Sequence, residues 1–352
     1  MDNRQFEYQR DMDALRFTDE QKQTLAARVA AGAAESAAPR YRCPIRRMAV
    51  IAAAAVLALA VGAGATGMLK SAAESFSGIF GGSAAQTEVI DKIGRPIGAS
   101  DTDNGVTITA DAIIGDQYNA AIVYTIRRDD GTALLPEGTD ARSLLMGDFG
   151  GADLPLRGGS HGSSWFVTDE ADGSAIQMVQ TISADVPISP CTATAKFENL
   201  YAWDDGAGEA VPVVEGRWRF RFDVDYEDAS VTLGGGETFT QDGMTFTVDA
   251  VSVSPVAVKV DYTVDSEVVW SSAPSGREPE ADSRQMRRYF ENVEILLVKT
   301  DGTVLHLSGS GGSVRPENGT TVCSKGGVLE EILPLEELEH ISVGGVVYEI
   351  CQ

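Results

Sequence analysis

NGVTITADAIIGDQYNAAIVYTI (Asn104–Ile126) and DGMTFTVDAVSVSPVAVKVDYTV (Asp242–Val264) align without a gap over their whole length. In both segments apolar side chains alternate with polar ones and β-branched residues are frequent, which is typical of strands with one buried face. An Asp-Gly-Thr turn sequence follows each copy, at Asp130–Thr132 and at Asp301–Thr303. Because one domain length separates the copies, the sequence predicts two related domains in tandem. Chance similarity between unrelated strands is the alternative.

The end of the first predicted domain carries the same strand signal. Four large apolar residues alternate there with charged ones, at Trp218, Phe220, Phe222 and Val224. Short strands separated by Gly, Asp and Pro turns favour a mainly β fold. We therefore predict two tandem immunoglobulin-like β-sandwich domains, the first at residues 104–229 and the second at residues 230–352.

A long uncharged segment, MAVIAAAAVLALAVGAGATGML (Met48–Leu69), lies before these domains. As a helix its 22 residues would span roughly 33 Å, enough to cross the hydrocarbon core of a bilayer. Ala63–Ala65 has the small residues of a signal-peptidase site, but a preceding segment of 47 residues is long for a signal peptide. We therefore predict a retained transmembrane helix at residues 48–69 that contacts the lipid bilayer.

The flanks of this span predict its orientation. Several arginines precede it, and acidic sequence follows it. Because positive charge favours the cytoplasmic side, the N-terminus is expected in the cytoplasm and the C-terminal domains outside the cell. The chain would then be a single-pass protein of the cell membrane. The arginines that flank the span are Arg40, Arg42, Arg46 and Arg47.

Residues 1–47 form the predicted cytoplasmic head. Within it, TDEQKQTLAARVAAGAAES begins with Thr18 and has Gln21 three residues later, a capping-box arrangement that favours a helix. Phe17, Leu25 and Val29 fall close to one face of that helix. So few large apolar side chains cannot form a core alone. The head is therefore either a loose helical tail or a helix that becomes ordered on a cytoplasmic partner.

Residues 70–103 are predicted as a juxtamembrane helix followed by a connector. Leu69, Ala73, Phe76 and Phe80 recur at helical spacing, and Gly81-Gly82 would end the helix. The following TEVIDKIGRPIGASDTDN contains two glycines and a proline, which indicates a connecting segment.

Charge excludes some partners of the outer part. The formal net charge is −24, with about +2 on the head and about −27 beyond Lys70. Such acidity argues against nucleic acid or anionic lipid as the partner of the outer domains. Their ligand is left unknown by the sequence.

The sequence predicts no metal, no cofactor and no enzymatic activity. The four cysteines lack C-x-x-C spacing, and the chain has only three histidines. A Cys323–Cys351 disulfide remains open. GGSHGSS (Gly158–Ser164) puts Ser160 beside His161, but it lacks the G-x-S-x-G elbow of a serine hydrolase and is interpreted as a flexible loop. Polar Ser271–Gln285 is also predicted as a surface loop.

Tryptophans are the remaining candidates for a ligand groove in the outer domains. Core packing is the simpler interpretation for Trp218. The four tryptophans of the chain are Trp165, Trp203, Trp218 and Trp270.

The order of these segments is itself informative. The segments RFTDEQKQTLAAR, an Arg-flanked Ala-rich span and EVIDKIGRPIGASDTDNGVTITADAIIGDQYNAAIVYTI follow one another between Arg16 and Ile126. This layout resembles a bacterial membrane family built around domain of unknown function 4179, whose members are described as anti-sigma-factor-like. The resemblance implies that the head holds a sigma factor while the exported domains sense a signal. The chain lacks an H-x-x-x-C-x-x-C zinc motif, so such binding would be metal-free.

These observations lead to two hypotheses of different class. The first is a single-pass membrane regulator, an anti-sigma factor whose head sequesters a sigma factor through Phe17, Leu25 and Val29 and whose outer domains sense an envelope signal. The second is a membrane-anchored extracellular binding or adhesion module with no regulatory head. Deleting residues 1–38 would distinguish them, because only the regulator would lose control of transcription.

Overall fold

The computed structural model describes residues 70–76, 78–135, 140–147, 150–168, 175–204, 208–271 and 279–350. The chain divides into two compact units, Met1–Ala63 and Gly64–Gln352, and every described residue belongs to the second. The predicted head and span lie outside the described residues, together with Phe17, Leu25, Val29, Arg40, Arg42, Arg46 and Arg47. Within the described ranges, no helix has the length and apolar character needed to cross a membrane.

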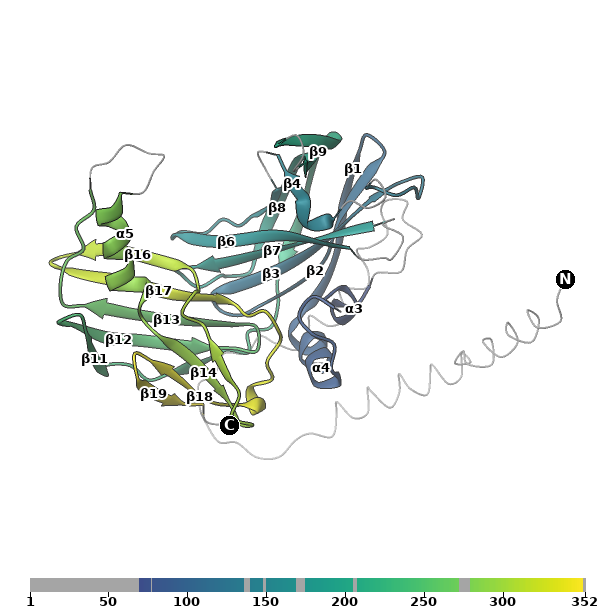
Figure 1. Cartoon of the computed structure of the whole chain (residues 1–352). Helices are drawn as coiled ribbons and strands as arrows, with labels where there is room; N and C mark the ends of the chain where they lie inside the picture. Colours follow the sequence, from purple (N-terminus) through teal and green to yellow (C-terminus); the bar gives the residue numbers. More distant parts are fainter. Residues whose placement is uncertain are drawn as a thin grey trace, which may run out of the picture. The chain divides into compact units, whose positions relative to one another are not determined.

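Strands dominate the described chain, as predicted (Figure 1). The first lobe, residues 95–224, has two antiparallel sheets. The larger sheet has the spatial order β1 (Arg95–Asp103), β2 (Val106–Gly115), β3 (Asn119–Arg128), β7 (Ala175–Ala184) and β6 (Ser160–Thr168). The smaller sheet is made of β4 (Leu144–Met146), β8 (Cys191–Asp204) and β5 (Gly150–Asp153), with β9 (Glu209–Val224) also paired to β8. A 3-10 turn, η3 (Ala141–Ser143), precedes β4.

The second lobe, residues 231–349, also has two antiparallel sheets. One has the order β10 (Val231–Leu233), β12 (Met244–Val253), β13 (Ala257–Val264), β17 (Thr320–Val328) and β16 (Gly312–Glu317), with β11 (Thr238–Gln241) paired to β12. The other has the order β15 (Val304–His306), β14 (Ile295–Lys299), β18 (Leu338–Val343) and β19 (Val346–Glu349). The helical segments of this lobe are α5 (Glu280–Met286), the π-helical turn η4 (Arg287–Glu291) and η5 (Leu335–Glu337).

Each lobe has its own apolar core. In the first lobe, Trp218, Phe220, Phe222 and Val224 are buried to 7 % exposure or less, which confirms the predicted alternation along β9. Trp218 donates its indole N–H to the Val106 carbonyl at 2.8 Å, so its one polar group is paired. A separate cluster of buried residues fills the second lobe.

The internal repeat has a structural counterpart in the two lobes. Asn104-Gly105 and Asp242-Gly243 both adopt positive φ and join two strands by a two-residue turn, the geometry of a type I′ hairpin. The register of the following hairpin then shifts at Asp111 in one lobe and at Asp249 in the other. The matching Thr125 and Thr263 hydroxyls donate to those two carboxylates. Turn, bulge and hydrogen bond therefore recur together.

The segment predicted as a connector contains more structure than its sequence indicated. The expected helix from Leu69 is short, α3 (Ala72–Phe76), and a second helix, α4 (Ala84–Ile93), follows the two glycines. Ser83 caps α4 through a reciprocal capping box with Gln86. Arg95–Asp103 then forms β1, in which Gly98 adopts a positive φ at a bulge. Pro96 and Gly98 at this bulge are residues typical of turns, and for that reason the sequence did not predict the strand.

Two predicted loops are also wrong in part. Ser160–Ser164 belongs to β6, because tertiary pairing with β7 overrides the low strand propensity of serine and glycine. Within Ser271–Gln285, helix α5 begins at Glu280, and its Asp282 carboxylate accepts from the N–H and hydroxyl of Ser271. At the end of the described chain, Gly344 and Gly345 adopt positive φ and join β18 to the closing strand β19. Cys323 is buried, but Cys351 lies outside the described residues, so their disulfide stays a prediction.

Within the second unit, the lobes meet at the tips of equivalent hairpins. The Asp116 carboxylate accepts from the N–H groups of Tyr118 and Asn119, and the Ser254 hydroxyl accepts from the N–H groups of Val256 and Ala257. Asp116 and Ser254 occupy matching positions in the aligned repeats. Ser254 also donates to Asp116 at 2.6 Å, so the two turns bond to each other inside the protein.

Candidate functional site

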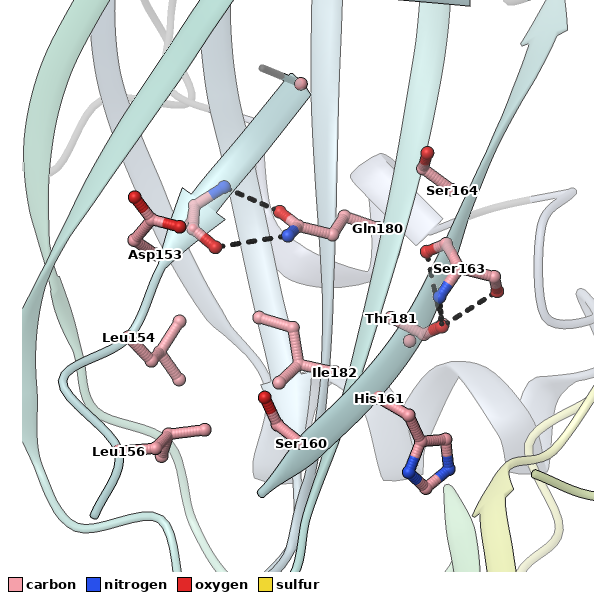
Figure 2. A pocket seen from close by; sticks show the side chains of 13 residues that line it. Asp153, Leu154, Leu156, Ser160, His161, Ser163, Ser164, Gln180, Thr181 and Ile182 are labelled. Atoms are coloured by element: carbon pink, nitrogen blue, oxygen red, sulfur yellow. Dashed lines mark hydrogen bonds between the residues drawn. The ribbon is translucent and has the colours of Figure 1, made fainter. Parts of the chain in front are cut away.

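A hollow of about 410 Å³ opens on one side of the first lobe. Its walls come from β5, β6 and β7 and from the segment that follows β5 (Figure 2). Its volume falls within the range of small ligand sites, roughly 300–1,000 Å³. We treat this hollow as the candidate functional site of the described chain.

Small residues on β6 create this space. Side chains alternate across the sheet, so Ser160, Gly162 and Ser164 lie on the same face as Phe166, which is buried in the core at 5 % exposure. Ser160 and Ser164 have only hydroxymethyl side chains and Gly162 has none, so no large side chain fills the space on this part of the face. Gly162 cannot carry a larger group, because an added Cβ would lie 2.0 Å from the Thr181 carbonyl.

One glutamine closes the gap between the two sheets. Gln180 on β7 accepts from the Ala152 N–H at 2.8 Å and donates to the Ala152 carbonyl at 3.1 Å, so its amide pairs with β5 as another strand would (Figure 2). The same Gln180 oxygen accepts from the Tyr124 hydroxyl at 2.9 Å. Burial raises the pKa of Tyr124 far above its ordinary value, so this phenol stays a donor.

Aliphatic and polar side chains both line the hollow, and the polar ones predominate. Leu154 and Leu156 approach it from the segment after β5, and Ile182 lies on β7 (Figure 2). Asp153 stands at the rim and pairs with Lys196 at 2.8 Å, in a position exposed enough that the pair contributes little stability. Such a surface suits aliphatic groups that are flanked by hydrogen-bonding atoms.

The arrangement does not form a hydrolase dyad. Ser160 and His161 are neighbours on an extended strand, and Figure 2 shows their side chains pointing in different directions. The buried Nε2 atom of His161 has no hydrogen-bond partner and lies close to Gly311 of the second lobe. Across the ranges that the structure describes, no cluster of metal-ligating residues is present.

The predicted candidates do not gather at this place. Trp218 is in the first core, Trp270 packs against the second core, and Trp165 makes an edge-to-face contact with Phe80, with ring centroids 6.5 Å apart. Trp203 is exposed. The hollow itself was missed by sequence reasoning. Its available signal was the run of small residues at alternate positions that ends at Phe166.

Comparisons with known proteins bear on the N-terminal part. Residues 44–128 match the family described as "Domain of unknown function (DUF4179)". No curated protein matches the chain. Among solved structures, the crystal structure of the conserved domain protein from Bacillus anthracis is similar at 16 % identity, with a TM-score of 0.46. The similarity covers 70 % of this chain and 75 % of that one.

Proposed function

We propose that the protein is a single-pass membrane regulator of the anti-sigma type. Its cytoplasmic head would sequester a sigma factor through Phe17, Leu25 and Val29, and its two lobes, of immunoglobulin-like sandwich type, would sense an envelope signal outside the cell. The match of residues 44–128 to the DUF4179 family supports the family resemblance of the predicted span and the start of the first lobe, and Phe17, Leu25 and Val29 precede the matched residues.

The observation that carries this proposal is the packing of the segment directly after the predicted span. Helices α3 and α4 and the turn between them contain Phe76, Phe80, Ile90 and Ile93, which are buried to 1 % exposure or less. Removal of each such side chain from water contributes about 2 kcal/mol. Because this segment is packed so tightly, it would move together with the lobes. A displacement of the lobes would therefore be transmitted to the predicted membrane span.

The same helices contact both lobes. Their buried cluster includes Val123 and Val179 from the first lobe and Val256 from the second. Gln86 on α4 donates to the Ile332 carbonyl at 3.0 Å, and the Ile332 N–H donates to the Phe80 carbonyl at 2.9 Å. A ligand that changes the contact between the lobes would therefore change the surroundings of the juxtamembrane helices. This is the arrangement that a sensor needs.

Co-purification of the full-length protein with sigma factors tests the proposal. We expect the wild type to retain a sigma factor and Leu25→Asp to lose it, because a carboxylate would be buried in the helix–groove contact. Gln23→Asp, two positions earlier and on the opposite side of the predicted helix, is the matched control and should retain the sigma factor. Recovery of none by the wild type, or equal recovery by Leu25→Asp, would contradict the proposal.

A deletion separates this function from that of an anchored adhesion module. Removal of residues 1–38 leaves the arginines and the span in place. Loss of transcriptional control with intact surface display supports the regulator, whereas unchanged transcription supports the adhesion module.

A further inference from the structure

We propose that the edge strand β6 binds an extended peptide by strand addition, with alternate apolar side chains of that peptide entering the hollow of the first lobe. The bound peptide would be a segment of another polypeptide. This binding activity stands independently of the regulatory role, and it is measured without a sigma factor.

Strand β6 forms an edge of its sheet, and its residues 162–165 are exposed. It is the last strand of its sheet, and among the described residues no further strand pairs with it. Its nine residues, SHGSSWFVT, contain no proline, lysine or acidic residue, and their register with β7 is unbroken. Proteins usually protect an edge of this length with charge, proline or a bulge. Gly162 is exposed, and because glycine has no side chain, the exposed atoms at this position belong to the backbone.

Two other edges of the same molecule carry that protection. At the opposite end of the sheet, β1 has a bulge after Pro96, and its Asp101 and Asp103 carboxylates accept from backbone N–H groups of β9 at 2.8 and 2.7 Å. In the second lobe, β16 contains Arg315 and Pro316. The edge strands β10, β11 and β15 also lack such protection, but they have only three or four residues, whereas β6 has nine.

The internal repeat indicates which class of molecule fits beside β6. Gln180 lies opposite Ile122, and Lys325 lies opposite Val260, the residue that matches Ile122 in the aligned repeats. Around Lys325 the space is filled by a peptide segment, because its ammonium donates to the carbonyls of Phe290 and Val293 at 2.8 and 2.9 Å. The Phe290 ring of that segment lies over Gly312 of β16, which pairs with Lys325. In the first lobe the matching residue is Ser164 of β6, which pairs with Gln180 and lines the hollow. A polypeptide is thus the class of molecule that this position accommodates in the second lobe.

A second copy of this chain would fit the edge of β6 less well than a separate peptide. Two β6 strands paired edge to edge would each bring Ser160, Gly162 and Ser164 to their inner faces. These side chains are too small to fill either hollow. A peptide with aliphatic or aromatic residues at alternate positions would fill the space above Leu154 and Ile182, and would gain hydrophobic stabilisation that self-pairing lacks.

The test measures binding of four capped octapeptides to the full-length protein. In these probes threonine alternates with valine, isoleucine, leucine or phenylalanine. We expect at least one to bind with a micromolar dissociation constant. Its analogue with N-methyl groups on alternate backbone amides, along the edge that faces β6, should bind at least tenfold more weakly, because those donors are lost.

Two variants test whether the peptide binds at β6. Ser160→Leu puts a side chain into the hollow and should weaken binding about tenfold or more. Ser100→Leu, an exposed position on the protected edge β1, should leave binding unchanged. Thermal unfolding of both variants checks that the fold is intact.

Three results would overturn the inference. They are failure of all four peptides to bind, equal binding of the N-methylated analogue, and equal binding by the folded Ser160→Leu variant. Self-association that Ser160→Leu abolishes, without peptide binding, would assign the edge to a contact between copies instead.

Discussion

The two lobes start from the same repeated hairpin and use one inward-facing position on the neighbouring strand differently. In the first lobe that position holds Gln180, a neutral side chain that pairs with β5 and leaves a hollow beside it. In the second lobe it holds Lys325, which is fully buried beneath the end of the helical segment α5–η4. Repetition of the backbone therefore does not dictate how the interior of a lobe is filled.

Lys325 fits its position because helices end with unpaired carbonyl groups. Its ammonium donates to the carbonyls of Phe290, Glu291 and Val293, and it lies 4.9 Å from the centre of the Phe290 ring. A buried ammonium with these partners satisfies groups that water cannot reach. The difference between the lobes is thus a difference between a filled, charged site and an open, neutral one.

The largest expected effect comes from removing that ammonium. Lys325→Met keeps the length of the side chain but leaves three buried carbonyl contacts unmade, so we expect a loss of about 3 kcal/mol in the free energy of unfolding. Guanidinium denaturation of the full-length protein measures it. Lys299→Met is the matched control, because its pair with Glu337 is partly exposed and contributes at most about 1 kcal/mol. Equal stability of Lys325→Met and the wild type would contradict this account of the second lobe.

The contribution of Lys325 to the free energy of unfolding should also depend on pH. Burial lowers the pKa of Lys325 from 10.5 to about 8. Between these values the unfolded chain holds a proton that the folded chain has released, so the contribution of Lys325 to stability rises with pH in that window. Below about pH 8 the lysine is protonated in both states and its contribution is constant. Buried tyrosines and Cys323, whose pKa values are raised, oppose this trend.

The difference in stability between wild type and Lys325→Met cancels the contributions of titrating groups that do not interact with the lysine. Their stability difference should change from pH 7.5 to pH 10.5 in favour of the wild type, as followed by denaturation at each pH. A constant difference over that range would show that the ammonium keeps its ordinary pKa.

The first lobe should respond less to the equivalent change. Gln180→Met removes the hydrogen bonds to Tyr124 and Ala152, but the adjacent hollow lets water reach the unpaired groups. We therefore expect a loss of about 1–2 kcal/mol, measured by the same denaturation. Gln177→Met, on the opposite face of β7, is the control for the substitution itself, because its amide makes only a long 3.5 Å contact with the Ser75 carbonyl. A loss of unfolding free energy equal to that of Lys325→Met would mean that water is excluded equally from the two positions.

These two positions also show what the sequence could predict. The alternation along the repeats and along β9 predicted a mainly β chain and the inward side chains of β9 correctly, because that signal is local and has period two. Neither Gln180 nor Lys325 was singled out, since nothing local distinguishes a buried polar residue from an exposed one. The partners of Lys325 lie more than 30 residues away. Strand β6 was missed for a related reason, because only pairing with β7 makes its serines and glycine a strand.

The smallest expected effect concerns the feature that the lobes share most closely. Thr125 donates to Asp111 in a partly buried position, whereas Thr263 donates to Asp249 at 2.7 Å in an exposed one. Because water competes more strongly at the exposed site, Thr125→Val should lose about 1 kcal/mol of stability and Thr263→Val about half of that. Valine preserves the β-branched shape, and the corresponding Ser variants retain the hydroxyl and should recover most of the difference. If both Val variants lost the same amount, the repeated bulge would be equally protected from solvent in the two lobes, and their difference would be confined to the interior beside Gln180 and Lys325.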